Sequence, residues 1–255
     1  MTHRSGASHV ASGLSVADIL AALYARVLRV RPLEPNWAQR DRLILSKGHA
    51  AAALYSVLAR TGFFDPTLLE TFYLDGSMLG GHATRGEVPG VEHSTGSLGH
   101  GLSVGVGMAY GARLRHHEWR TFVVLSDGEC DEGSTWEAAM FASHHGLGNV
   151  AAVVDYNRIQ SLASTDATLT LEPFSAKWTA FGWRVVEIDG HDHDQLVGAL
   201  EMDTDLSQPL VVVAHTIKGK GVDFMENSVL WHYRAPNILE REAALQQLRS
   251  ERGER

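Results

Sequence analysis

The sequence predicts an α/β fold in which an open, mainly parallel sheet carries helices on both faces. Short runs rich in β-branched residues alternate with longer amphipathic segments along the chain. The short runs are almost continuously apolar instead of alternating, which is typical of parallel strands that are covered on both faces. A β-α-β-α order of this kind indicates an open sheet with a helical layer on each side.

The expected strands are four or five residues long and are apolar-rich. They lie at residues 42–45, 121–125, 150–154, 184–188 and 210–214. Helical spacing of apolar residues predicts a first helix, with Ser15 to Asp18 as its N-terminal cap. Three further helices are expected at residues 49–61, 132–145 and 236–249. Gly62 and Gly146 follow two of them, at the position where glycine commonly ends a helix.

Bulk composition sets the broad class of the protein. The chain has 255 residues, of which 44% are hydrophobic, so it can bury a full core. No linker-like segment interrupts it, and we therefore expect a single domain over residues 1–255. The net charge is −8 and the basic residues are scattered, so we expect no nucleic-acid partner.

Cysteine usage and hydropathy bear on the compartment. Cys130 is the sole cysteine, which excludes a disulfide framework and favours a reducing compartment. The first ten residues contain no apolar signal segment. No apolar run approaches the ~20 residues of a membrane helix. We therefore expect a cytoplasmic protein without a membrane partner.

Polar residues follow three of the expected strands, where ligands of open parallel sheets bind. Asp127 follows the strand at 121–125, and Asn157 follows the strand at 150–154. His215 and Lys218 follow the strand at 210–214. Carboxylate and amide oxygens suit Mg²⁺, whose remaining ligands are usually water and phosphate. Asp-Gly and Asn are also common turn residues, so a simple turn remains the alternative for each position.

A glycine-rich stretch between residues 76 and 111 contains the segment 94–101, which leads into an apolar helix. A glycine-rich turn at a helix N-terminus can bind an anion. The alternative is a flexible loop whose small residues allow tight helix packing. The segment lacks the Gly-Lys-Ser/Thr ending of a P-loop, and no GxGxxG turn follows a strand directly.

Histidine is abundant, with 14 residues in the chain. Imidazoles suit proton transfer and the recognition of hydroxyl or phosphate groups. Spacings typical of transition-metal sites, such as HExxH, are absent. The histidines that lie in glycine-rich or polar loop contexts are His9, His49, His82, His93, His100, His191, His215 and His232.

Several separate motifs occur together in one order along the chain. They are Ser8-His9 with Ser12, Ser46-Lys47-Gly48-His49-Ala50, Thr95-Gly96-Ser97-Leu98-Gly99, the segment from Asp127 to Asn157, and Trp231-His232. On these motifs the chain resembles the N-terminal, diphosphate-binding part of transketolases over nearly its whole length. It looks especially like the split form, in which that part is a separate polypeptide.

The resemblance implies the thiamine-diphosphate-binding fold of the diphosphate-binding type, with thiamine diphosphate and Mg²⁺ as cofactors. It implies that Asp127 and Asn157 are side-chain ligands of Mg²⁺ and that a main-chain carbonyl near Ile159 adds a third ligand. It also implies that His49 and Gly128 contact the diphosphate.

Other site residues are implied in the same way. Gly96, Ser97 and Leu98 are expected to lie against the cofactor, and Glu132 is expected in a polar network beside the metal. Lys218 is expected in a loop that closes over the cofactor. The residues expected to face the donor and acceptor sugars, orienting hydroxyls and assisting proton transfer, are His9, His82 and His232.

Three positions differ from, or add to, the usual family pattern. Ser126 replaces the first glycine of the usual Gly-Asp-Gly, and a local adjustment without loss of binding is expected. His100 stands where glutamine is common in the long enzymes, which leaves the acceptor preference open. Cys130 lies inside the motif but at no ligand position, and is expected to fill space.

The resemblance implies transfer of a two-carbon ketol unit from a ketose phosphate to an aldose phosphate. The pyrimidine-binding and C-terminal domains of complete transketolases are expected on a partner subunit, in an α₂β₂ assembly. Three alternatives stay open: a specialised relative that delivers the unit to a non-sugar acceptor or carrier protein, a deoxyxylulose-phosphate synthase, and a non-catalytic scaffold. Retention of Asp127, Asn157 and the sugar-facing histidines argues against a scaffold.

Overall fold

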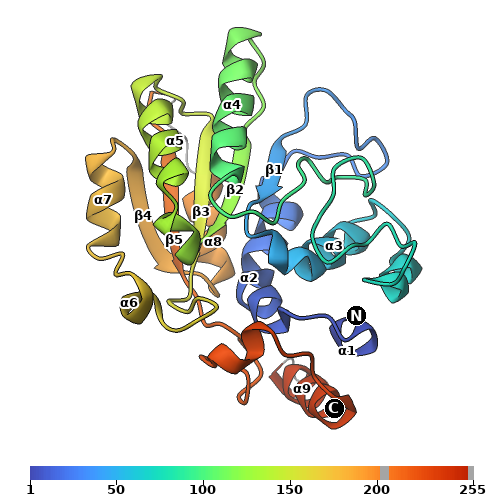
Figure 1. Cartoon of the computed structure of the whole chain (residues 1–255). Helices are drawn as coiled ribbons and strands as arrows, with labels where there is room; N and C mark the ends of the chain where they lie inside the picture. The colour runs from blue at the N-terminus through green and yellow to red at the C-terminus, as the bar shows by residue number, and fades with distance from the viewer. Residues whose placement is uncertain (202–206, 252–255) are drawn as a thin grey trace.

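The computed structural model describes residues 1–201 and 207–251, and within them one parallel sheet forms the centre of the fold (Figure 1). Its strands follow the order β1-β2-β3-β5-β4, and all neighbours are parallel. The predicted fold class is confirmed, and each predicted strand is found. The strand bounds are Arg42–Leu45 (β1), Thr121–Ser126 (β2), Val150–Tyr156 (β3), Arg184–Asp189 (β4) and Leu210–His215 (β5).

The strands are apolar on both faces because both faces are covered by helices. Successive residues of a strand point to opposite sides, so Val123 and Val124 on β2 enter different parts of the core. Val124 pairs with Val153 on β3, and both belong to the core beneath α2, α3 and α8. Val123 and its partner Ala152 belong to the core beneath α4, α5 and α7.

Figure 1 shows α4, α5 and α7 over one face of the sheet, with α2 and α8 over the other. A π-helical turn, Leu23–Val27, continues α2. The helix bounds are Thr2–Ser5 (α1), Val10–Ala22 (α2), Ala51–Arg60 (α3), Gly101–Leu114 (α4), Gly133–His144 (α5), Thr165–Thr168 (α6), Phe174–Ala180 (α7), His193–Glu201 (α8) and Ile238–Glu251 (α9).

The predicted N-terminal cap of the first helix is wrong. α2 begins at Val10, and its N-cap is His9, whose backbone is left-handed with a φ of 70°. Ser15 lies fully buried within the helix, and its Oγ donates a hydrogen bond to Asp155 at 2.6 Å. A serine followed by a carboxylate three residues later resembles a cap. Here the hydroxyl is used for a contact with the sheet.

The other predicted helix ends agree with the structure to within two or three residues. Gly62 and Gly146 follow α3 and α5, and both adopt the left-handed backbone that favours glycine at a helix end. A short 3₁₀ turn, Gly48–Ala50, precedes α3. α9 begins two residues after Pro236, where the last helix was expected to start.

One helical segment among the described residues, Val10–Val27, is long and apolar enough to cross a membrane by length and composition alone. Its 18 residues have a mean hydropathy of 1.5, so the expectation that no apolar run approaches this length is wrong. More than half of the segment, 56%, is buried inside the fold. Packing against α3, α8 and β3 accounts for its apolar residues.

Candidate functional site

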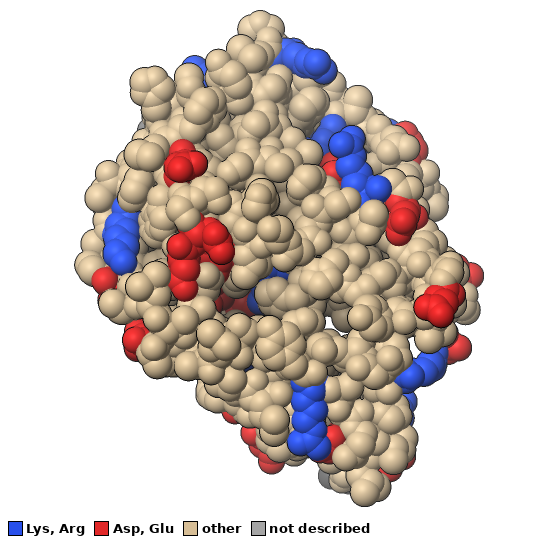
Figure 2. All heavy atoms as spheres, in the orientation of Figure 1, with Lys and Arg blue, Asp and Glu red and all other residues tan. Residues whose placement is uncertain are grey.

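A cavity of about 340 Å³ lies beyond the carboxyl ends of the central strands, as expected for an open parallel sheet. Figure 2 shows this face hollowed near its middle, with acidic and basic atoms at the floor of the hollow. The predicted site residues that line the cavity are His9, His49, His82, Gly96, Leu98, Asp127, Gly128, Asn157, Ile159, Lys218 and His232. Further lining residues are Lys47, Ser126, Gln160, Ser161 and Tyr233.

The carboxylate of Asp127 is held at the end of β2 by main-chain amides. Its Oδ1 accepts a hydrogen bond from the amide of Gly128 at 2.7 Å, and its Oδ2 accepts from the amide of Arg158. Burial, together with the nearby charge of Asp155, raises the pKa of Asp127 to about 6. The carboxylate is 1% exposed, and its pKa shows that its charge is poorly compensated by its protein neighbours.

Asn157 presents its amide group beside Asp127 at the end of β3. Its Nδ2 donates to Ser15 Oγ at 3.1 Å, and its Oδ1 accepts from the amide of Ile159 at 3.1 Å. The carbonyl oxygen of Ile159 accepts a hydrogen bond from Lys218 Nζ at 3.0 Å. The turn after β3 therefore brings two further oxygen atoms to the cavity.

These oxygens fit a hard divalent cation such as Mg²⁺. Among the described residues, no group of three or more His, Cys, Asp or Glu side chains could hold a metal. A metal at this place would depend on Asp127, the Asn157 amide and the Ile159 carbonyl, with water or phosphate completing its shell. The undercompensated charge of Asp127 is consistent with a cation there.

A buried ion pair between Lys47 and Asp155 supports the floor of the cavity. Asp155 also accepts hydrogen bonds from Ser15 Oγ at 2.6 Å and from Thr216 Oγ1. Burial alone would raise the pKa of Asp155, but Lys47 and these hydroxyl groups hold it below its ordinary value. The pair joins β1, β3, β5 and α2, and neither residue was predicted as part of the site.

Three histidine rings gather at one wall of the cavity. The ring centroid of His9 lies 5.1 Å from that of His49 and 5.1 Å from that of His232. Burial, reinforced by nearby positive groups, lowers the pKa of His9 to about 4 and that of His232 to about 3. The pKa of His49 is also well below its ordinary value, chiefly because of burial. All three rings are therefore neutral near pH 7. His82 lies farther out, 6.5 Å from His9, and is exposed.

Lys218 links the histidine wall to the turn after β3. Its side chain is buried, and its Nζ donates to His232 Nδ1 at 2.9 Å as well as to the carbonyl of Ile159. Burial and the charge of Lys47 lower the pKa of Lys218 to about 8, which leaves it largely protonated at neutral pH. The lone pair of His232 Nδ1 faces the lysine, so the proton of the neutral ring lies on Nε2.

The glycine-rich turn approaches the segment before α3 so closely that side chains are excluded. A Cβ atom on Gly48 would lie 2.7 Å from the carbonyl carbon of Thr95 and 2.8 Å from the amide nitrogen of Gly96. Gly96 and Leu98 reach the cavity, whereas Ser97 is exposed and does not line it. The structure therefore places two of these three predicted residues at the cavity.

The acidic residue of the inner polar network is Glu129, and the expectation for Glu132 is corrected. Glu132 is exposed and precedes α5 as its N-cap. Glu129 is fully buried and accepts hydrogen bonds from Ser46 Oγ and from the amide of Gly99, the latter at 2.8 Å. Two acids three residues apart look alike in sequence, and the 3₁₀ turn after Asp127 decides which one points inward.

The positions that depart from the family pattern are accommodated. Ser126 is buried at the cavity, and its Oγ accepts a hydrogen bond from the amide of Glu129 at 3.3 Å. His100 is exposed and lies outside the cavity lining, with its Nδ1 3.0 Å from the carbonyl oxygen of Leu98. Cys130 is buried, and burial raises the pKa of its thiol well above the ordinary value.

Trp231 forms part of a small apolar cluster next to the histidine wall. It is 3% exposed, and its ring lies 5.5 Å from that of Phe224. The guanidinium of Arg234 lies 4.7 Å from the centre of the indole ring. His232 follows Trp231 directly, so this cluster supports one side of the cavity.

Comparison with known proteins agrees with this geometry. The family described as "Transketolase, thiamine diphosphate binding domain" matches residues 2–249. The chain belongs to the transketolase family. It carries that family's thiamine diphosphate binding domain, as the sequence resemblance indicated.

Two relatives within the transketolase family are similar in length to this chain. One of the named subunits of the apulose-4-phosphate transketolase of Phocaeicola vulgatus is 40% identical over 256 residues, covering 100% of this chain and 90% of the relative. The 6-deoxy-6-sulfo-D-fructose transketolase subunit SqwG of a Clostridium species is 43% identical over 228 residues, covering 89% of this chain and 83% of the relative.

Solved transketolase structures share the fold but are longer. The transketolase of Campylobacter jejuni superposes with a TM-score of 0.91 at 29% sequence identity. The match covers 99% of this chain and 40% of the Campylobacter chain. The present chain thus corresponds to one part of that transketolase.

Proposed function

We propose that this chain is the N-terminal subunit of a split transketolase, which transfers a two-carbon ketol unit from a ketose phosphate to an aldose phosphate. The observation that carries the proposal is the cavity at the strand ends. There, oxygen donors, a buried lysine and neutral histidines converge in a thiamine diphosphate binding domain. Bound thiamine diphosphate would supply the carbanion chemistry that breaks and forms the bond beside the ketose carbonyl.

The oxygen donors of the chain serve to anchor the cofactor. Asp127, Asn157 and the carbonyl of Ile159 would hold Mg²⁺, which would in turn neutralise the diphosphate. His49 and Gly128 line the same cavity and would contact the diphosphate. The charge of Lys218 adds to this anion-binding environment, because its ammonium remains largely protonated at neutral pH.

The histidine wall serves to orient sugar hydroxyls and to move protons. His9 and His232 are neutral near pH 7, so each ring offers one nitrogen that donates and one that accepts. His9 Nδ1 is buried and has no hydrogen-bond partner within the described structure, so it is available to a ligand. His82 stands nearer the cavity mouth, where it would meet the more distant part of a sugar.

We further propose that a C-terminal subunit completes the enzyme in a cytoplasmic α₂β₂ assembly. The chain spans 90% of a relative whose name makes it one subunit of a transketolase, but only 40% of a solved transketolase. The partner would contribute the pyrimidine-binding domain and the glutamate that activates the cofactor. Because this glutamate would come from the partner, the chain alone should cleave no ketose.

A specialised role is the second candidate. The names of two relatives refer to apulose 4-phosphate and to 6-deoxy-6-sulfo-D-fructose. These names support a donor outside the common sugar phosphates, and His100 near the glycine-rich turn is a position where acceptor preference could differ. Delivery to a non-sugar acceptor or carrier protein belongs to the same candidate.

The proposal is tested by co-expressing the chain with the product of the adjacent gene. Ketose cleavage is measured with and without thiamine diphosphate and Mg²⁺, using common ketose phosphates and the two sugars named above. We expect cleavage from the pair with both cofactors and none from the chain alone. Cleavage by the chain alone would refute the split arrangement, and binding of cofactor without cleavage of any donor would favour a scaffold or a non-sugar acceptor.

The metal assignment has its own variants. Asp127→Ala and Asn157→Ala should each weaken cofactor retention sharply, as measured by calorimetry in the presence of Mg²⁺. Asp166→Ala is a suitable control because Asp166 is exposed and pairs with Arg158 at the surface. Unchanged retention in both site variants would remove Asp127 and Asn157 from the metal site.

A further inference from the structure

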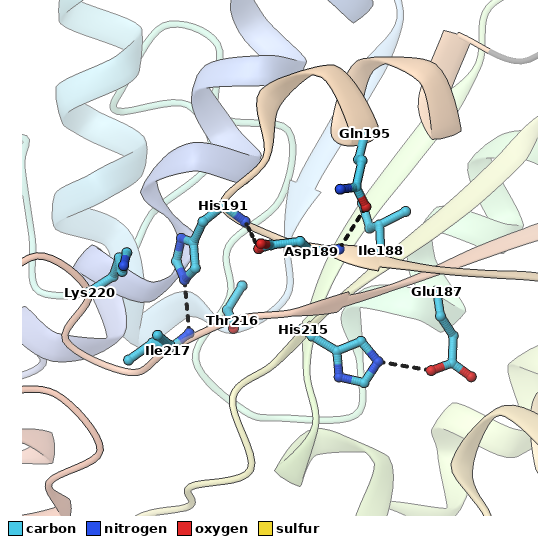
Figure 3. Close-up of a pocket in the computed structure, with 9 residues that line it drawn as sticks. All are labelled: Glu187, Ile188, Asp189, His191, Gln195, His215, Thr216, Ile217 and Lys220. Atoms are coloured by element: carbon cyan, nitrogen blue, oxygen red, sulfur yellow. Dashed lines mark hydrogen bonds and ion pairs between the residues drawn. The ribbon is translucent and has the colours of Figure 1, made fainter.

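A second, more open cavity of about 560 Å³ lies beyond the ends of β4 and β5 (Figure 3). His191 follows β4, and Ile217 lies in the segment that follows β5. In Figure 3 the ring of His191 points toward the main chain of Ile217, while His215 pairs with Glu187 at the other end of the cavity. His191 therefore joins the edge of the sheet to the segment that carries Lys218.

Both ring nitrogens of His191 are engaged. Nε2 accepts a hydrogen bond from the amide of Ile217 at 2.9 Å, and Nδ1 lies 2.8 Å from Asp18 Oδ2. Because an amide can only donate, Nε2 must be unprotonated, and the proton of the neutral ring is on Nδ1, where it faces the carboxylate. The side chain of His191 is 11% exposed, so water competes little for these bonds.

The segment held by His191 has its neighbouring residues in the first cavity. Thr216 Oγ1 donates to the buried Asp155, and Lys218 Nζ donates to the carbonyl of Ile159 and to His232. Ile217 lies between them and is bound from the opposite side by His191. Three consecutive residues are thus fixed alternately from the cofactor side and from the rear.

We propose that His191 is a positioning residue that holds the segment 216–218 from the rear and thereby keeps Lys218 in the cofactor site. Asp18 on α2 fixes the tautomer that this role requires. The consequence for cofactor affinity rests on the proposed function. The contact between His191 and Ile217 does not depend on it.

His193 provides a matched control. Its Nε2 lies 2.9 Å from the other oxygen of Asp18, so it shares the same carboxylate. Its side chain is 60% exposed, and in the described structure it makes no hydrogen bond to the segment 216–218. Replacing His193 therefore disturbs Asp18 without removing the acceptor for Ile217.

The experiment compares His191→Phe, His191→Gln and His193→Phe in the full chain, alone and with its partner subunit. Hydrogen exchange of the Ile217 amide and calorimetric affinity for thiamine diphosphate with Mg²⁺ are measured. Loss of one hydrogen bond should accelerate amide exchange and weaken cofactor binding by about tenfold each in His191→Phe. Glutamine can donate to Asp18 and accept from Ile217, so His191→Gln should restore both values, and His193→Phe should change neither.

Wild-type exchange and affinity in His191→Phe would overturn the proposal, and so would an equal effect of His193→Phe. Failure of the wild-type chain and its partner to bind thiamine diphosphate would refute the proposed function, while the exchange of Ile217 would still test the contact with His191. The ¹⁵N shifts of the His191 ring in the wild-type chain need no variant that might fail to fold. A proton on Nδ1 supports the proposal, and a proton on Nε2 overturns it.

Discussion

Lys47 and Asp155 form an ion pair at the floor of the candidate site, and neither side chain is more than 1% exposed. Lys47 follows β1, and Asp155 lies near the end of β3, two residues before Asn157. The hydroxyls of Ser15 and Thr216 satisfy the remaining acceptor sites of Asp155. The pair thus ties together four elements whose ends form the cavity, and the support of the cavity depends on both charges being present.

Removing one member of this pair should be costly. We expect Lys47→Met to lower the free energy of unfolding by about 3–5 kcal/mol, because Asp155 would remain buried without its partner. Urea denaturation measures this change. Arg31→Met is the control, because the pair between Arg31 and Glu34 is exposed and should contribute less than about 1 kcal/mol. A loss for Lys47→Met no greater than that of the control would contradict the prediction.

Glu129 and Glu132 should respond differently to the same substitution. In Glu129→Gln, an amide NH₂ replaces an oxygen that faces hydrogen-bond donors, and we expect a loss of about 1–3 kcal/mol. Glu132→Gln changes an exposed residue and should alter stability by less than about 0.5 kcal/mol. Thermal and urea unfolding of both variants provide the measurement. Equal losses would show that the buried network does not discriminate between the two acids.

Two glycines of α4 offer a test of helix-to-sheet packing. A Cβ atom on Gly105 would overlap a methyl group of Val123 on β2, so Gly105→Ala should destabilise the fold by about 1–3 kcal/mol. No atom lies within 4 Å of the corresponding position on Gly107. Gly107→Ala should therefore stabilise the helix by up to about 1 kcal/mol. Opposite signs in denaturant unfolding are expected, and the same sign for both would argue against this packing.

The lowered pKa of His9 predicts a pH dependence of stability. Burial, with His82 and nearby lysines, lowers the pKa to about 4 in the folded chain, while an unfolded histidine titrates near ~6.5. As the pH falls from ~6.5 to ~4, the unfolded state binds a proton that the folded state does not, so stability decreases in that window. Above ~6.5 this group contributes no pH dependence.

His9→Asn removes the titrating ring and keeps a residue that tolerates the left-handed backbone at this position. The melting temperature of the variant should therefore fall less than that of the wild type between about pH 7 and about pH 5. Parallel curves for the two proteins over this range would show that His9 titrates as it does in the unfolded chain.

The strands were predictable because each is a short, continuously apolar run, a pattern that few other elements share. The order β1-β2-β3-β5-β4 is not encoded in such a pattern, since it depends on which edges meet in space. The helix cap at Ser15 was misassigned because a hydroxyl that binds Asp155, 140 residues away, looks the same in sequence as a local cap.

The candidate site was predictable to a similar extent. Residues directly after strands, such as Asp127 and Asn157, follow from the rule that ligands bind at strand ends. The assignment of histidine roles depended on the family resemblance. The ion pair between Lys47 and Asp155 could not be inferred, because a buried charge is recognised only when its partner is known.

The place of Trp231 gives the chain an intrinsic optical probe. Its indole is buried beside His232 at one wall of the cavity, whereas Trp136, Trp178 and Trp183 lie together in the core on the other side of the sheet. Emission from Trp231 should therefore change when the cavity is filled, while the three clustered rings give a nearly constant background. A variant that retains only Trp231 would allow cofactor entry to be followed in real time without any attached label.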